Sequence, residues 1–288
     1  MLHLIVNADD FGLSEKVNEG ILEAHRNGIV TSTSLMANGA MFEHAVDICR
    51  ETPTLDVGIH LCLVEEPPIL PTHKISSLVN ESGRLHRHAK VFIGKYLRGH
   101  ISLQEIKNEL EAQVKKVMSQ GIVVSHLDGH QHLHVLPGVL RITLELAKQY
   151  GIPAIRIPNE TLYPYMFRNV EGITRVLESV VLKLFCQLGK NIDLLHPQGF
   201  AGFFFGGNLN KKNLLQTLES LPRSGTCEIM CHPGHDDPHP PYTQWGYHWK
   251  DELDALTVPF TLSVLKQKNI HLISYREFAR GELMSENL

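Results

Sequence analysis

Short apolar runs alternate with amphipathic helical stretches along most of this 288-residue chain, and this alternation limits the fold more than any other feature. The first three runs are LHLIVN, IVTSTSLMA and LDVGIHLCLV, at residues 2–7, 29–37 and 55–64. Later strand candidates are IVVSHLD, AIRIP, IDLLHP, TCEIMCHPG and IHLISY. Seven or eight strands that alternate with helices predict a mostly parallel sheet. The length then favours a single (β/α) barrel domain over residues 1–288.

The helical stretches carry signals for where they begin and end. Residues 14–28 start at a serine and finish at a glycine, as helices often do. The clearest helix covers residues 102–121, where Ser102 and Glu105 have capping-box spacing and the apolar residues repeat along one face. Further helices are expected at residues 170–188, 211–221 and 252–267. An insertion at about residues 65–99 is expected to lie over one end of the sheet.

Composition excludes several classes of protein. The net charge is −4 and no basic stretch stands out, so a nucleic-acid surface is not expected. No apolar run approaches the roughly 20 residues that a membrane-spanning helix needs, and the N-terminus does not resemble a signal peptide. The five cysteines are scattered, which fits a reducing compartment better than a disulfide framework. We therefore expect a cytoplasmic protein.

Reactive side chains occur where four separate strands are expected to end. NADDFG ends the first strand, GIHLCL carries His60, and SHLDGHQHLH and MCHPGHDD end two later strands. In a (β/α) barrel the carboxyl ends of all strands meet at one mouth, where active sites lie. These four clusters are therefore expected to converge, although they are far apart in the sequence.

Asp9, Asp10 and His60 are candidates for metal chemistry. Neighbouring residues of a strand point to opposite faces, but where the chain turns at a strand end both aspartates can face the mouth. The alternative is an Asx turn or helix cap around Asp10. A lone His60 in an apolar run would be a hydrogen-bonded core residue more often than a ligand. Together with an aspartate and a second histidine, it makes a three-ligand set that leaves positions open, as in catalytic metal sites.

Four histidines within residues 126–134 supply candidates for the second imidazole. Strand alternation places His126, Asp128 and His130 on one side, and these groups cannot all bind one ion. The alternative is a solvated histidine-rich turn. His232 follows an apolar strand and suits a general acid, or equally a structural histidine before a proline turn. The aromatic residues of the loop at 235–253 suit stacking on a sugar or packing as a lid, and Arg156 is a lone charge at a strand end.

The four motifs together resemble the YdjC-like carbohydrate deacetylase family. NADDFGLS, GIHLCL, SHLDGHQHLH and EIMCHPG occur in the family's order and extend over almost the whole chain. The resemblance implies a deacetylase-type, TIM-like barrel and a metal-dependent hydrolase that removes the N-acetyl group from an amino sugar and releases acetate. Other stretches, such as VTSTSLMANGAMFEHAV and GYHWKDELDALTVP, look like the branch associated with hopanoid biosynthesis. The substrate is then a chito-oligosaccharide or an N-acetylglucosaminyl glycolipid.

Site roles follow from the same resemblance. Asp9 looks like the catalytic base and His232 like the acid, while Asp10, His60 and His130 look like the ligands of one divalent ion. His126 is the rival of His130. The ion is Mg²⁺ or Zn²⁺, since a carboxylate suits magnesium and two imidazoles favour a transition metal.

The family also implies a homodimer, and a glycolipid substrate would imply peripheral membrane contact. Two other functions stay open at this point. One is a metal-dependent phosphoesterase or amidohydrolase, and the other is a non-catalytic protein that binds a metal or a sugar. The sequence has no glycine-rich phosphate loop to support the first.

Overall fold

The computed structural model describes residues 1–168, 170–188, 192–236, 242 and 245–281. Its centre is a sheet in which every recorded strand pair is parallel. The neighbour order is β5-β4-β3-β2-β1-β7-β6, and β8 pairs with the beginning of β1. The strands are β1 (Leu2–Phe11), β2 (Ser32–Leu35), β3 (Asp56–Leu61), β4 (His126–Gly129), β5 (Ala154–Ile155), β6 (Gly199–Ala201), β7 (Gly225–Cys231) and β8 (Ile270–Leu272).

The two ends of this strand order meet through single bridges. Ala154 bridges Leu195, and Glu160, which follows β5, bridges Phe200 of β6. The sheet therefore curls into a (β/α) barrel that is joined at one seam by isolated bridges instead of a ladder. This confirms the predicted fold class.

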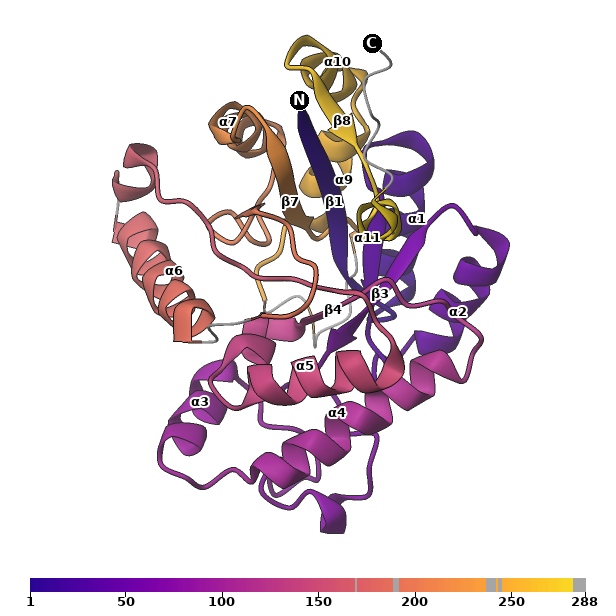
Figure 1. The fold of residues 1–288 in the computed structure, drawn as a ribbon, viewed down its shortest axis with the longest axis vertical. Helices are drawn as coiled ribbons and strands as arrows, with labels where there is room; N and C mark the ends of the chain where they lie inside the picture. The colour runs from indigo at the N-terminus through magenta and orange to yellow at the C-terminus, as the bar shows by residue number, and fades with distance from the viewer. Residues whose placement is uncertain (169, 189–191, 237–241, 243–244, 282–288) are drawn as a thin grey trace.

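Helices surround the strands, with α1 and α2 on one side, α4 and α5 next to each other below, and α6 at the opposite edge (Figure 1). The α-helices are α1 (Glu15–Asn27), α2 (Phe42–Glu51), α3 (Ala89–Leu97), α4 (Leu103–Met118), α5 (Val139–Tyr150), α6 (Val170–Leu188), α7 (Lys211–Ser220), α9 (Trp249–Thr257), α10 (Pro259–Gln267) and α11 (Tyr275–Arg280). Short 3-10 turns are η1 (Thr72–Lys74), η2 (His130–Val135) and η3 (Pro164–Phe167).

The helix starts follow the predicted capping chemistry in part. Ser14 accepts a hydrogen bond from the backbone N–H of Val17 at 3.2 Å, and Ser102 accepts one from Glu105 at 3.4 Å. Glu105 does not complete the capping box, because its carboxylate instead accepts hydrogen bonds from the backbone and hydroxyl of Ser77. That contact ties the segment before α3 to the start of α4.

Three expected elements differ from the structure. The helix expected at residues 252–267 is two helices, because Pro259 has no N–H to continue α9 and Val258 is extended. IDLLHP forms no strand and contributes only the bridge at Leu195. The eighth strand is instead β6, a short stretch that carries no strong apolar signal.

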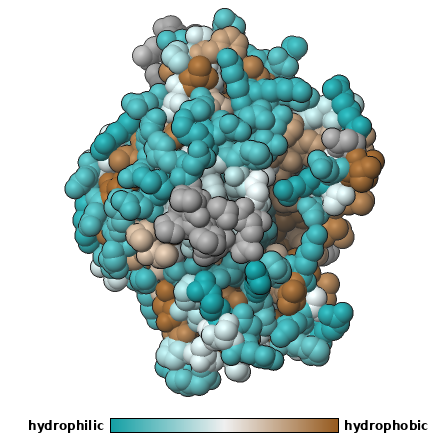
Figure 2. Space-filling view, turned by 180° about the vertical axis from the view of Figure 1, so that it is seen from behind, coloured by the Kyte–Doolittle hydropathy of each residue, from teal (hydrophilic) through white to brown (hydrophobic). Residues whose placement is uncertain are grey.

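The expected insertion at residues 65–99 leaves the sheet. It contains η1, an antiparallel bridge between Val79 and Leu85, and α3. The surface seen from behind is mostly hydrophilic, with apolar residues in several small groups around its outline (Figure 2). No helix among the described residues is long and apolar enough to cross a membrane.

Candidate active site

A β-bulge in β1 brings the neighbouring aspartates to the same site. Ala8 pairs with Thr33 and Phe11 pairs with Leu35, so β1 has one residue more than β2 between these pairs. Asp10 takes a left-handed conformation with φ of 63°, which residues other than glycine, asparagine and aspartate rarely adopt and which costs a non-glycine residue about 1–3 kcal/mol. Because of this turn, both carboxylates are buried and lie near His60.

Asp10, His60 and His130, the ligand set that the family resemblance implies, form one compact group. Asp10 Oδ1 lies 2.9 Å from His130 Nδ1 and 3.4 Å from His60 Nε2. Each residue offers a ligand atom within 4.8 Å of the others. Asp10 Oδ2 is buried and has no hydrogen-bond partner among the described residues. An orphaned carboxylate oxygen beside two imidazoles fits a divalent cation, and three ligands leave positions for water and substrate.

A second group with metal-binding residue types contains Asp9, His60 and Asp128. Here a cation is already present, because Arg156 Nη1 lies 2.6 Å from Asp9 Oδ2 and 2.8 Å from Asp128 Oδ2. Arg156 is fully buried and also contacts Glu228 at 2.7 Å. The guanidinium supplies the positive charge that these carboxylates need. A metal ion is therefore better placed at Asp10 than at Asp9.

From the sequence, Arg156 was only a lone charge at a strand end. In the structure its guanidinium joins carboxylates from three strands inside the barrel. Its two-point contact fixes the plane of the Asp9 carboxylate, and Asn7 donates a further hydrogen bond to Asp9 Oδ1 at 2.9 Å. Glu228 is held on its other oxygen by the hydroxyl of Tyr275 at 2.5 Å. No sequence motif indicates this network, because the residues that form it come from five separate elements or loops.

The histidine-rich segment is divided between the site and the core. Gln131 and His132 both have φ of 53°, so the chain turns sharply after His130. His130 faces Asp10, whereas His134 Nε2 lies 3.0 Å from the carbonyl oxygen of Arg156. His132 packs against Phe200 and Phe203. The segment is thus an ordered turn, and only one of its four imidazoles belongs to the group at Asp10.

His126, the rival ligand, lies deeper in the barrel. Its ring stacks on Tyr275 at a centroid distance of 3.8 Å, and its nitrogens lie 2.9 Å from Ser125 Oγ and 3.2 Å from Ser34 Oγ. Burial lowers the pKa of His126 to about 4. Neither group of potential ligands in the described chain includes it.

His232 lies at the same cavity as Asp9. A small space of about 60 Å³ is bordered by Asp9, His60, His130 and His232. The Nδ1 atom of His232 has no hydrogen-bond partner among the described residues and lies 4.0 Å from Glu252 Oε2. The same carboxylate oxygen accepts the backbone N–H of His232 at 2.6 Å. Four of the five residues predicted for the site therefore border one cavity, and the fifth, Asp10, lies against two of them, His60 and His130.

Comparison with known proteins places this geometry in a family. The family model described as YdjC-like protein matches residues 3–267. The chain belongs to the YdjC-like family. It is 33% identical over 277 residues to a carbohydrate deacetylase of Brevibacillus brevis, covering 96% of this chain and 99% of that protein. It is 34% identical over 262 residues to a chitooligosaccharide deacetylase of Salmonella paratyphi B, covering 88% and 90%.

A solved structure has the same fold. It is a protein from Enterococcus faecalis V583 whose crystal structure is named for cellobiose-phosphate cleavage. It aligns with this YdjC-like chain with a TM-score of 0.72 and 28% identity, covering 96% of this chain and 98% of that chain. The resemblance read from the four motifs is thereby confirmed at the level of the family.

Charges around the YdjC-like site hold both histidines in their protonated form when no metal is present. Burial alone would lower the pKa of His60, but the charges of Asp128 and Asp9 and its hydrogen bonds raise it to about 9. Burial also opposes charge on His130, yet Asp10 and Glu65 raise its pKa well above the usual value. Burial favours a neutral Asp10, but His130 and His60 hold its pKa well below the usual range. A divalent cation would replace these protons.

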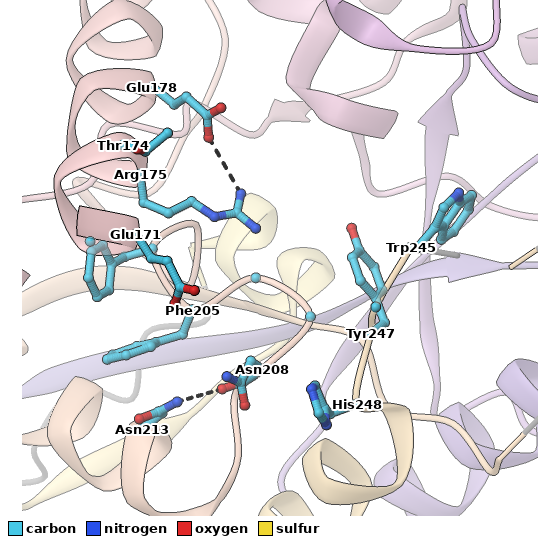
Figure 3. Close-up of a pocket in the computed structure, with 15 residues that line it drawn as sticks. Glu171, Thr174, Arg175, Glu178, Phe205, Asn208, Asn213, Trp245, Tyr247 and His248 are labelled. Carbon is cyan, nitrogen blue, oxygen red and sulfur yellow. Dashed lines mark hydrogen bonds and ion pairs between the residues drawn. The ribbon is translucent and has the colours of Figure 1, made fainter. Parts of the chain in front are cut away.

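A larger cavity of about 660 Å³ adjoins the small one and shares Arg175, Gly206 and Tyr247 with it. Arg175 extends from α6 into this space, with Glu178 behind it at 3.7 Å, while Tyr247 and Trp245 line the far side (Figure 3). Of the aromatic loop, residues 237–241 and 243–244 lie outside the described residues. Trp249 is buried in the core and does not line the cavity, so the loop combines packing and cavity-lining residues.

Proposed function

We propose that this YdjC-like chain is a metal-dependent carbohydrate N-deacetylase, which hydrolyses the N-acetyl group of an amino sugar and releases acetate. The names of its relatives support the reaction class. One observation carries the proposal: the buried, unpartnered Oδ2 of Asp10 lies beside two imidazoles, and the Arg156-bound carboxylate of Asp9 lies next to it on the same bulge.

Asp10, His60 and His130 would hold the ion. When bound, a divalent cation supplies Lewis acidity, which polarises the acetyl carbonyl and makes water a stronger acid. The carboxylate suits Mg²⁺ and the two imidazoles favour Zn²⁺ or another transition metal. With two nitrogen ligands of three, we propose Zn²⁺ or a similar ion over Mg²⁺.

Asp9 acts as the base in this proposal. Arg156 fixes the plane of its carboxylate, and Oδ2, which accepts a hydrogen bond from Arg156 alone among the described residues, keeps a lone pair that can accept a proton. Asp9 takes a proton from the attacking water as the new C–O bond forms. His232, on the same cavity, gives a proton to the amide nitrogen as the C–N bond breaks. The products are acetate and a free amine.

The larger cavity accommodates what is attached to the reacting sugar. Its walls combine aromatic rings with charged and amide groups, which is the surface that sugar rings require. We therefore favour a chito-oligosaccharide over a glycolipid. A cytoplasmic location and a homodimer stay predictions, the first resting on five free cysteines and the second on the family resemblance alone.

The test is release of acetate and free amine. Purified protein is stripped with a chelator, reloaded separately with Zn²⁺, Mn²⁺ or Mg²⁺, and incubated with N-acetylglucosamine, its dimer and trimer, and an N-acetylglucosaminyl lipid. We expect turnover of the oligomers that depends on the added metal. A nitrophenyl phosphate ester serves as the control substrate for the rival phosphoesterase function. Phosphate release without acetate release would overturn the proposal, and so would binding of oligomers with no turnover under any metal.

A further inference from the structure

Both histidines of the group at Asp10 have a carboxylate behind them. His60 turns Nε2 towards Asp10 and has Nδ1 at 2.8 Å from Asp128 Oδ1. His130 does the reverse, with Nδ1 towards Asp10 and Nε2 at 2.8 Å from Glu65 Oε2. A carboxylate that accepts the far N–H of an imidazole fixes which nitrogen is free to bind a metal, and also orients the ring.

Glu65 reaches His130 through an unusual backbone conformation. Its φ is 72°, in the left-handed region that a residue with a side chain rarely adopts. Two contacts hold it there: its N–H donates to the carbonyl of His86 at 2.9 Å, and Arg84 donates to its carbonyl at 3.0 Å. Strained residues of this kind persist where the surrounding structure demands them, often at functional sites.

We propose that Glu65 is a positioning residue for metal binding: it accepts the Nε2–H of His130 and so presents the Nδ1 lone pair towards Asp10. This inference rests on the metal site of the proposed function, but on neither the substrate nor the reaction. Glu65 itself is not part of the group whose ligand atoms lie within 4.8 Å of one another, so it acts through His130.

The neighbouring Glu66 provides a matched control. It has the same charge and is buried, but its carboxylate approaches the Tyr242 hydroxyl at 3.4 Å and Arg84 at 3.8 Å. Its charge acts on His130 only at longer range, without a hydrogen bond or ion pair in the part of the chain that the structure describes. Asp128 is a poorer test of the same idea. It also contacts Arg156 and Ser34, so its replacement would disturb the network around Asp9.

The experiment measures zinc affinity by titration calorimetry on chelator-treated protein, without substrate. Glu65→Asn keeps a residue type that tolerates positive φ but is too short to reach His130, and we expect the zinc Kd to rise about 10- to 100-fold. Glu65→Gln keeps an acceptor without the charge and should restore part of the affinity. Glu66→Gln should bind zinc within about twofold of the wild type.

A double-mutant cycle separates positioning from a general structural effect. In a His130→Ala background, titrated with zinc to millimolar concentrations, Glu65→Asn should change the Kd by less than about twofold. Thermal unfolding of the metal-free variants checks folding, and if Glu65→Asn does not fold, Glu65→Gln takes its place in the cycle. The proposal fails if Glu65→Asn binds zinc as the wild type does, or if it weakens zinc equally in both backgrounds. Zinc binding with no deacetylase activity would count against the proposed function alone.

Discussion

The carboxylate of Asp9 and the guanidinium of Arg156 form a two-point pair, with Nη1–Oδ2 at 2.6 Å and Nη2–Oδ1 at 2.7 Å. Both side chains are buried, and Arg156 also faces Asp128 and Glu228. One cation thus offsets several carboxylates in a region closed to solvent. Removing one partner of such a network leaves buried charges unpaired. This lowers the free energy of unfolding more than replacing all partners by apolar residues would.

Arg156→Met should therefore destabilise the protein by about 3–5 kcal/mol, because it leaves the carboxylates uncompensated. Arg156→Lys keeps the charge but cannot make the two-point contact, so we expect a folded protein whose kcat falls about 100-fold. Urea unfolding and acetate release measure the two effects. Arg141→Lys is the control, since Arg141 is 74% exposed, and it should change neither quantity. An Arg156→Met variant as stable as the wild type would contradict the assignment of Arg156 as the counter-charge.

The neighbouring aspartates should respond differently to the same substitution. Asp9→Asn removes the proposed base but leaves the group at Asp10 intact, so zinc should bind within a few-fold of the wild type while kcat falls by about 10²–10⁴. Asp10→Asn removes a proposed ligand, so zinc affinity and activity should fall together. Calorimetry and acetate release on both variants check this. If Asp9→Asn loses zinc and Asp10→Asn keeps it, the two roles are exchanged.

Zinc should stabilise the fold, because Asp10, His60 and His130 come from β1, β3 and η2 and are brought together only in the native state. At a free zinc concentration 100 times the Kd, linkage adds about 2.7 kcal/mol to the free energy of unfolding. For a chain of 288 residues that corresponds to roughly 4–5 °C in Tm. Scanning calorimetry with and without zinc measures the shift. His60→Ala should abolish most of it, and an undiminished shift in that variant would place the zinc elsewhere.

The convergence of the polar clusters could be predicted because a barrel brings the ends of its strands to one mouth, whatever the details of packing. The particular set Asp10, His60 and His130 came from the family resemblance, and its role as a ligand set stays a prediction. The sequence left the choice between His126 and His130 open, since that choice depends on where β4 ends and on the left-handed turn at Gln131 and His132. Alternation along a strand carries no signal of such a turn.

Glu65 and Arg156 show a different limit. Each acts through a contact with residues distant in the sequence, and neither has a local motif that would single it out. Glu65 lies in a segment whose polar composition is typical of a surface insertion. The break between α9 and α10 is of another kind. A single helix was expected there, but the break could have been predicted, because Pro259 lies inside the expected helix and a proline there removes a hydrogen bond. The meeting of strand ends could thus be predicted from the fold class, whereas contacts made by single residues outside any motif could not.

His126 should make the fold sensitive to mild acid. Burial is the main reason that its pKa falls to about 4 in the native state, against about 6.5 in the unfolded chain. The unfolded state thus takes up a proton before the native state does. The stability that a neutral His126 contributes is fully present above about pH 6.5 and is lost as the pH falls towards 4, by up to about 3 kcal/mol. His134, whose pKa burial also lowers to about 4, contributes in the same direction.

Urea unfolding between pH 7.5 and pH 5 measures this slope. His126→Gln keeps hydrogen-bonding capacity but cannot titrate, so its free energy of unfolding should fall less steeply with acid than that of the wild type, even if its value at pH 7.5 is lower. His100→Gln, at an exposed position, should leave the slope unchanged. Comparing slopes removes the packing cost of the substitution, which shifts the whole curve without tilting it. Equal slopes for His126→Gln and the wild type would mean that His126 has the same pKa in the native and the unfolded state. That result would contradict the effect expected from its burial and its stacking on Tyr275 inside the barrel.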